Sequence, residues 1–269
     1  MMINPSAPIG IFDSGVGGLT VAQSIKQRMP EEQLIYFSDS RHMPYGDKSK
    51  LLIETYAQNI IRFLIKKGCK VVVIACNSAS SNALEVIKQE VTQGIHVFDV
   101  IHPVIESIDF ATGHKLGVIA TRATVQSDVY RRAIKKRHPH LEIVQMATPL
   151  LAPMIEEGFQ NDEISRVVVN HYLKREELKG IETLILACTH YSIIKREIRN
   201  FYGGRVRLID STRIVANRIY RCLAESNLLS EYLLKKDLFY VSDLTDAFER
   251  QAKIFFGQEI TLQLQDLSP

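Results

Sequence analysis

The sequence has few cysteines, no long apolar run and almost no excess of charge of one sign. Its 269 residues include four cysteines, which are too few and too scattered for the disulfide framework of a small secreted domain. No segment approaches the roughly 20 apolar residues of a membrane-spanning helix, and the N-terminus has no secretory signal pattern. We therefore expect a cytoplasmic protein with free thiols and no membrane association.

The charges nearly cancel, because the chain has 33 Lys and Arg residues and 30 Asp and Glu residues, which leaves a net charge of +3. Nucleic-acid binding usually needs a concentrated basic surface, so we expect no nucleic-acid partner. A hydrophobic share of 46% and a charged share of 23% are typical of a globular protein and exclude a disordered chain or a coiled coil. A small molecule is the expected ligand.

Short apolar runs alternate with segments of helical period along the chain, which predicts repeated β-α units and a mainly parallel, doubly wound sheet. Helices are expected at 19–29, 49–67, 125–136 and 194–201. Strands are expected at 8–12, 33–37, 70–75, 116–120, 141–145, 183–187, 206–209, 238–242 and 261–265. At about 150 residues per domain, the length favours two α/β lobes that share a cleft. Counting the units places the lobe boundaries near residues 98 and 210.

Two cysteines occupy matching local sequences, KVVVIACNSAS at residues 70–80 and ETLILACTHYS at residues 182–192. Each is an apolar strand that ends in Ala-Cys and is followed by a predicted helix. Ligands of open α/β sheets bind beyond the carboxyl ends of the strands, which places Cys76 and Cys188 where chemistry occurs. A helix N-terminus lowers the pKa of a nearby thiol, so we expect both cysteines to ionise readily. Cys69 and Cys222 have no such context and are expected to be structural.

These cysteines allow two other interpretations. A free cysteine is most often a small buried hydrophobe, but the duplication, once in each lobe, favours a pair that faces one ligand from opposite sides. A zinc site usually draws two ligands from one close spacing such as C-x₂-C, and neither Cys76 nor Cys188 has such a neighbour. No metal site is therefore predicted.

The loop DSGVGG at residues 13–18 follows a strand and opens a helix, so its glycines can bring backbone N–H groups close to an anion. The spacing is not that of a dinucleotide-binding fingerprint, and no phosphate-binding lysine follows. Asp13 is placed to bind an ammonium group or steer a proton, and Ser14 to bind a carboxylate.

The other candidate binding groups are mostly uncharged donors in loops at strand ends. This inventory suits a small amino acid or a dicarboxylate and suits a nucleotide poorly. The residues are Tyr45, Gly46, Asn77, Ser78, Thr121, Thr124, Thr189 and His190.

Six ordered motifs resemble the cofactor-independent glutamate racemases of bacterial cell-wall synthesis, within the aspartate/glutamate racemase superfamily. The resemblance spans nearly the whole chain. The motifs are GIFDSGVGGLTV (10–21), HMPYGD (42–47), IACNSAS (74–80), GVIATRATVQSDVY (117–130), PLLAPMIEEG (149–158) and LACTHYS (186–192).

The resemblance implies two pseudo-symmetric lobes, 1–98 completed by 211–269, and 99–210, with the active site between them. It implies that glutamate is the substrate, that no cofactor is needed, and that the product D-glutamate serves peptidoglycan synthesis. It is also compatible with a homodimer.

By position, the resemblance makes Cys76 and Cys188 the catalytic acid/base pair. Asp13, His190 and either Glu156 or Glu157 would assist the pair. The substrate-binding set that it implies is Asp13, Ser14, Tyr45, Gly46, Asn77, Ser78, Thr121, Thr124, Thr189 and His190.

The chemistry agrees with this arrangement, because inversion of a stereocentre by proton transfer needs a base on one face and an acid on the other. Without an electron sink, oriented donors in a water-poor cleft must stabilise the carbanion, which implies closure of the lobes.

Three alternatives remain open: an aspartate racemase or related two-cysteine isomerase, a binding protein without turnover, and a hydrolase with one cysteine nucleophile. The motifs DSGVGGLTV and Thr189-His190-Tyr191 favour glutamate over aspartate, and the paired cysteines argue against a binding protein. In a hydrolase, His190 would have to orient Cys188, and the two residues are very close in sequence.

Overall fold

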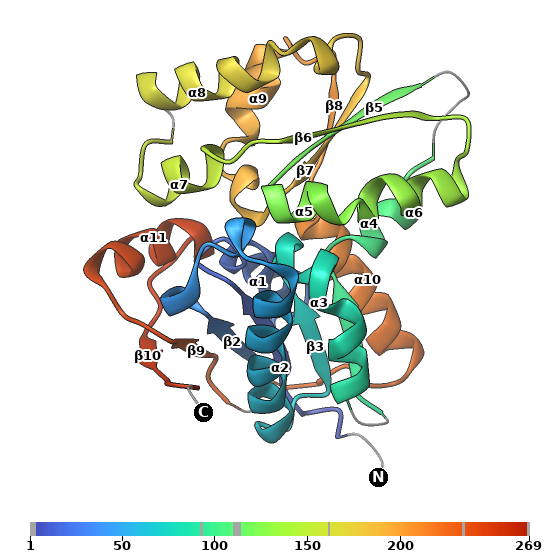
Figure 1. The fold of residues 1–269 in the computed structure, drawn as a ribbon. Coiled ribbons are helices and arrows are strands. Elements are labelled where there is room, and N and C mark those ends of the chain that lie inside the picture. Colours follow the sequence, from blue (N-terminus) through green and yellow to red (C-terminus); the bar gives the residue numbers. More distant parts are fainter. Residues whose placement is uncertain (1–3, 92–93, 110–113, 161, 233–234, 268–269) are drawn as a thin grey trace.

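The computed structural model describes residues 4–91, 94–109, 114–160, 162–232 and 235–267, and Figure 1 shows two α/β lobes packed against each other. In these ranges the strands form a six-stranded sheet, β10-β9-β2-β1-β3-β4, and a four-stranded sheet, β6-β5-β7-β8. All of the strand pairs are parallel. The prediction of two parallel-sheet α/β lobes is confirmed.

The first lobe contains the N-terminal β-α units and the strands nearest the C-terminus. Its N-terminal elements are β1 (Ile9–Asp13), α1 (Leu19–Arg28), β2 (Leu34–Ser38), the 3₁₀ turns η1 (Ser40–His42) and η2 (Tyr45–Asp47), α2 (Lys50–Lys66), β3 (Val71–Ile74), α3 (Asn77–Glu90), β4 (His96–Asp99) and α4 (His102–Glu106). Its C-terminal elements are α10 (Thr212–Glu225), β9 (Leu238–Val241), α11 (Asp246–Phe256) and β10 (Leu262–Leu264). β9 pairs with β2, so the chain returns to the sheet where it began.

Helices cover both faces of this sheet because successive strand residues point to opposite sides. Along β1, Ile9 and Ile11 enter one apolar core, which also contains residues of α1, α10 and α11. Phe12 enters the other core with α2 and α3. β3 is fully buried between β1 and β4, as its run of valines predicts.

The second lobe contains the elements from β5 to β8, and its core continues the core that covers the α1 face of the first lobe. These elements are β5 (Lys115–Ala120), α5 (Arg122–Ser127), α6 (Val129–Arg137), β6 (Glu142–Ala147), α7 (Leu151–Glu156), α8 (Glu163–Leu173), η3 (Glu176–Leu178), β7 (Thr183–Ala187), η4 (Thr189–Ser192), α9 (Lys195–Phe201) and β8 (Arg207–Ile209). The chain passes between the two sheets after β4 and again after β8, close to the predicted boundaries at residues 98 and 210, which stay predictions.

Several local predictions were wrong. The single helix expected at 125–136 is two helices, because Asp128 adopts a left-handed conformation with φ of 55° and ends α5. The strand expected at 141–145 lies at Glu142–Ala147. The strand β4 and the helices α7 and α8 were not predicted. Within the described residues, no helix combines the length and apolar character needed to cross a bilayer.

Candidate active site

The two matching cysteines each follow a strand, and the two strands belong to different sheets. Cys76 follows β3 and is the N-cap residue of α3, while Cys188 follows β7 and precedes the 3₁₀ turn η4. Both side chains are buried, with exposed fractions of 6% and 9%. The charge of Cys188 contributes to the raised pKa of Cys76, so the two thiols lie within electrostatic reach of each other. The fold therefore brings together the two cysteines that were selected from sequence.

The expectation that both thiols ionise readily is wrong for Cys76. Its Sγ lies 3.5 Å from Oγ of Ser14. Burial raises the pKa of the Cys76 thiol to about 12, and the charge of Asp13 raises it further, while contacts with Ser14 and with the backbone N–H of Ala79 oppose the rise. Desolvation outweighs the helix N-terminus here because almost no water reaches the sulfur.

Cys188 is the N-cap residue of the short 3₁₀ turn η4, which separates it from the α-helix α9. Its Sγ lies 3.6 Å from Nδ1 of His190, two residues further along the chain. Nε2 of the same ring lies 2.9 Å from Oε1 of Glu156, at the end of α7, which packs on η4. Glu157 is exposed, so of the two carboxylates considered from sequence, Glu156 is the one that reaches the site.

The surroundings of His190 favour the protonated form of its imidazole. Burial lowers the pKa of His190, but the charge of Glu156 and the contacts with Cys188 and Glu156 raise it more, and the pKa lies well above its usual value of 6.5. Nδ1 of this ring faces Sγ of Cys188, and Nε2 lies at ion-pair distance from Oε1 of Glu156, although it makes no well-aligned hydrogen bond among the described residues. Cys188 thus lies beside an imidazole whose protonated form is favoured, whereas Cys76 lies near the carboxyl group of Asp13.

Asp13, the last residue of β1, connects the two halves of the site. Its Oδ1 accepts a hydrogen bond of 2.8 Å from the backbone N–H of Gly15, and its Oδ2 accepts one of 3.4 Å from Oγ1 of Thr189. Burial raises the pKa of Asp13 from 3.8 to about 6, despite the attraction of His190 and the hydrogen bonds from the glycine loop. The loop N–H of Gly15 therefore serves Asp13 itself rather than a bound anion.

The glycine loop also packs closely against the second lobe. A Cβ on Gly17 would lie 2.3 Å from Oγ1 of Thr189 and 2.5 Å from Nδ1 of His190. A Cβ on Gly46 would lie 2.8 Å from Cβ of Thr121, again across the lobes. These contacts leave no room for a side chain, so glycine at both positions lets the lobes close over the cysteines.

The remaining predicted binding residues form polar contacts that cross between the lobes. Oγ of Ser78 lies 2.9 Å from Oγ1 of Thr121, which in turn donates to Oγ1 of Thr124 at 3.1 Å. Oδ1 of Asn77 accepts a hydrogen bond of 2.8 Å from the hydroxyl of Tyr130. The Nδ2 of Asn77 is buried without a partner among the described residues, so this amide has a donor available for a ligand.

Two supporting residues were missed from sequence. Asp39 follows β2 and accepts a 2.5 Å hydrogen bond from the Tyr45 hydroxyl, and its other oxygen accepts from Ser242. Tyr45 was predicted to bind substrate, and in the structure its hydroxyl donates to Asp39. The second residue missed from sequence is Tyr130, which orients Asn77. Tyr130 lies in the quoted motif 117–130, but Asp39 and Tyr45 could have been paired only from the fold.

Cys69 and Cys222 lie away from this group, as predicted. Burial raises the pKa of the Cys69 thiol to about 12, and Cys222 is half-buried on α10, 3.7 Å from Nδ1 of His96. In the described part of the chain, no three His, Cys, Asp or Glu side chains are grouped in a way that could hold a metal ion.

This constellation of paired cysteines, Asp13 and His190 invites comparison with known proteins. A family model described as Asp/Glu/Hydantoin racemase matches residues 18–219 of the chain. The chain belongs to this family. Glutamate racemases of Neisseria meningitidis serogroup A and Chlorobaculum tepidum are 40% and 37% identical to it, over 258 and 260 residues that cover 95% and 96% of this chain and 95% of each relative.

The Asp/Glu/hydantoin racemase fold is also found in a close structural relative. The crystal structure of glutamate racemase from Francisella tularensis in complex with D-glutamate has a TM-score of 0.91 and 35% sequence identity, and the match covers 98% of both chains. The resemblance that the six sequence motifs indicated is confirmed by these matches. These matches do not assign roles to the individual residues of the site.

Proposed function

We propose that this chain interconverts L- and D-glutamate without a cofactor, with Cys76 and Cys188 as acid and base on opposite faces of the α-carbon. The observation that carries the proposal is the meeting of two buried cysteines, one from each lobe, within electrostatic reach of each other. The glutamate racemases that match nearly the whole chain support the choice of substrate. The product D-glutamate would then serve peptidoglycan synthesis.

The neighbours of the two sulfurs suggest how each can both give and accept a proton. Cys76 is a thiol at neutral pH, with its pKa raised to about 12 by burial and by the charge of Asp13. If the ammonium group of glutamate binds to Asp13, it neutralises this charge and makes ionisation of Cys76 easier. Cys188 faces Nδ1 of His190, which can donate a hydrogen bond to the sulfur when this nitrogen carries a proton.

The carboxylates of glutamate require donors, and the site supplies neutral ones. The unpartnered Nδ2 of Asn77 and the hydroxyls of Ser78, Thr121, Thr124 and Thr189 are the groups that we assign to them. Ser14 and the backbone at Tyr45 and Gly46 complete the proposed binding set. Donors that are fixed in advance can stabilise the negative charge that develops when the α-proton leaves.

The decisive experiment follows α-proton exchange in D₂O, separately from L- and from D-glutamate, with no added cofactor. We expect solvent deuterium in the product enantiomer of the wild type. Cys76→Ser and Cys188→Ser should each lose racemisation while they unfold at wild-type urea concentrations, and Cys222→Ala should retain it. Racemisation at the wild-type rate in either serine variant would refute the two-base proposal, and faster turnover of aspartate would refute the substrate.

Supply of D-glutamate is tested separately in a bacterial strain that requires D-glutamate for growth. Expression of the wild-type chain should restore growth, whereas the Cys76→Ser variant should not. Rescue by the variant, or no rescue by an active wild type, would contradict the peptidoglycan role.

A cysteine hydrolase is the second candidate, because Cys188, His190 and Glu156 lie in series at 3.6 Å and 2.9 Å. The closeness of His190 to Cys188 in sequence does not prevent their contact. A hydrolase needs one nucleophile and would survive loss of Cys76. Retention of ester hydrolysis in Cys76→Ser, with an acyl adduct on Cys188 detected by mass spectrometry, would favour this function over racemisation.

A further inference from the structure

The carboxylate of Asp39 joins side chains from three segments behind the turn that carries Tyr45 and Gly46. Asp39 follows β2 and is buried. Its Oδ2 accepts the 2.5 Å hydrogen bond from the Tyr45 hydroxyl, and its Oδ1 accepts one of 3.0 Å from Oγ of Ser242, which follows β9. Nδ1 of His42 lies 2.9 Å from the same Oδ1. An ionised carboxylate only accepts hydrogen bonds, so we assign the donated proton to Nδ1.

The ring of His42 is oriented by an aromatic side chain of α2. It stacks on the ring of Tyr56, with centroids 4.1 Å apart and planes at 11°. Tyr56 in turn lies against Tyr45, with ring centroids 5.8 Å apart. The backbone N–H of His42 also donates to the carbonyl of Asp39 at 3.0 Å. Stacking and the backbone contact together therefore direct Nδ1 toward Asp39.

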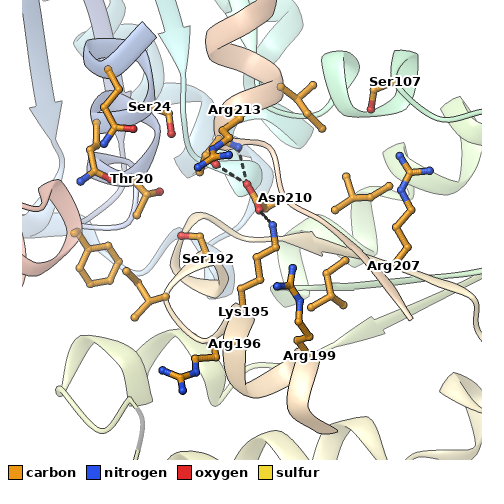
Figure 2. A pocket seen from close by; sticks show the side chains of 18 of the residues that line it. Thr20, Ser24, Ser107, Ser192, Lys195, Arg196, Arg199, Arg207, Asp210 and Arg213 are labelled. Carbon is orange, nitrogen blue, oxygen red and sulfur yellow. Dashed lines mark hydrogen bonds and ion pairs between the residues drawn. The ribbon is translucent and has the colours of Figure 1, made fainter. Parts of the chain in front are cut away.

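The side chain of His42 is not enclosed by the core. It is 35% exposed and borders a cavity of about 180 Å³, which Asp39 and Tyr56 also line. The larger cavity between the lobes, shown in Figure 2, contains the ion pair of Lys195 and Asp210, and none of these three residues lines it. The ring is therefore positioned chiefly by Asp39 and Tyr56, and a change of side chain at this position meets open space.

The turn that Tyr45 opens reaches the second lobe. Gly46 comes so close to Thr121 that a Cβ on the glycine would lie 2.8 Å from Cβ of the threonine. Asp47, the last residue of η2, forms an ion pair of 2.8 Å with Arg122 at the start of α5. Because the hydroxyl of Tyr45 is held from the first lobe, its hydrogen bond helps to fix where the turn meets Thr121.

We propose that His42 is a positioning residue for glutamate binding. Its hydrogen bond keeps Asp39 in the orientation that holds the Tyr45 hydroxyl. The backbone of Tyr45 and Gly46 is then fixed where it can donate to the substrate. His42 itself acts through Asp39 and does not contact glutamate. The inference rests on the proposed function, because it concerns how the same substrate is bound.

Loss of this contact should weaken glutamate binding without slowing the proton transfer. The turn contacts the substrate before and during the reaction alike, so it contributes uniform binding, which appears in KM and not in kcat. One hydrogen bond of ordinary net strength corresponds to about fivefold in binding. We therefore expect KM for both enantiomers to rise about fivefold, with kcat within about twofold of the wild type.

Racemisation kinetics of three variants of the whole chain separate the hydrogen bond from the ring. His42→Phe keeps a ring that can stack on Tyr56 but removes the donor, so KM should rise about fivefold. His42→Asn loses the ring but carries an N–H donor at the corresponding position, Nδ2, so KM should stay within about twofold of the wild type. His171→Phe makes the same change at an exposed histidine of α8 and should keep the wild-type KM.

A double-mutant cycle with Tyr45→Phe tests the route from His42 to the turn. Tyr45→Phe removes the hydroxyl that donates to Asp39, so it should also raise KM about fivefold. If His42 acts through this hydroxyl, His42→Phe should add less than about twofold in the Tyr45→Phe background, whereas independent effects would multiply to about 25-fold. Calorimetric titration with racemic glutamate at equilibrium measures the same effects as dissociation constants, without net turnover.

Three results would overturn the role of His42: an unchanged KM in His42→Phe, an equal rise in His42→Asn, or multiplicative effects in the cycle. A fall in kcat at unchanged KM would also contradict it, because it would place His42 in the proton transfer. A wild-type protein that neither binds nor racemises glutamate would refute the proposed function instead. If the wild type binds glutamate without racemising it, the calorimetric cycle still tests His42 while the catalytic proposal fails.

Discussion

Replacement of Asp13 by Asn is expected to stabilise the fold at neutral pH while it impairs turnover. The carboxyl group is fully buried, and its pKa is raised from 3.8 to about 6, chiefly by burial. A raised pKa means that the native state binds the proton more tightly than the unfolded state. The favourable contribution of Asp13 to stability is therefore fully present below pH 3.8 and is lost as the pH rises through about 6.

The size of the effect follows from the shift in pKa. A displacement of about two pKa units corresponds to about 3 kcal/mol, at roughly 1.4 kcal/mol per unit. Asn carries no charge, so it avoids this cost above pH 6, and its Oδ1 can still accept from Gly15 N–H. Loss of one further backbone hydrogen bond to the carboxylate would subtract about 1 kcal/mol at every pH. The quantity to measure is thus the difference in free energy of unfolding between variant and wild type, and specifically how this difference changes with pH.

Urea unfolding, followed by circular dichroism at intervals between about pH 4 and pH 8, gives this difference. We expect the stability of Asp13→Asn relative to wild type to rise by about 3 kcal/mol across that range, most of it below pH 7. Glu177→Gln, at an exposed carboxylate without a side-chain contact in the described structure, serves as the control. A relative stability of Asp13→Asn that stays constant or falls with rising pH would refute the assignment of a buried, destabilising carboxylate.

Two further substitutions probe the same site. Gly17→Ala should lose most activity and about 1–3 kcal/mol of stability, because its Cβ would lie 2.3 Å from Thr189 Oγ1. The control is Gly203→Ala, at a position with φ of 57° and no neighbour within 4 Å, which should be strained yet keep wild-type kcat. Equal losses of kcat in both variants would contradict the steric argument. Glu156→Gln should lower the pKa of His190, because burial then acts without the opposing carboxylate. NMR titration of the ring carbons measures this pKa, and an unchanged value would show that Glu156 does not control the charge of His190.

The sequence alone could predict those features that follow from hydrophobic periodicity or from repeated motifs. Alternating apolar and helical segments predicted the two parallel sheets, and the valine run at 70–75 predicted the fully buried β3. The duplicated Ala-Cys strand ends, one in each lobe, predicted that Cys76 and Cys188 would face one ligand, because ligands of open α/β sheets bind beyond the carboxyl ends of the strands. Of the carboxylates at 156 and 157, only the fold shows which one turns toward His190.

Sequence patterns could not predict contacts between segments that are far apart in the chain. Tyr45 was predicted to bind substrate, yet its hydroxyl donates a hydrogen bond to Asp39 because η2 folds back over the end of β2. The break between α5 and α6 depends on one residue, Asp128, in a conformation that a helical period does not reveal. The pKa of Cys76 was misjudged for the same reason, since the local sequence shows the helix N-terminus but not the burial or the approach of Asp13.

The two cysteines have similar local sequences but opposite neighbours, and thermodynamics limits what this asymmetry can do in a racemase. Enantiomers have equal free energies, so catalysis must give equal kcat/KM values in both directions at every pH. The carboxyl group near Cys76 and the imidazole near Cys188 therefore cannot favour one product. They can change the common value of kcat/KM and how each direction divides between kcat and KM, because they influence which thiol holds its proton before substrate binds. A duplicated thiol in unequal surroundings is thus fully compatible with a reaction whose equilibrium is symmetric.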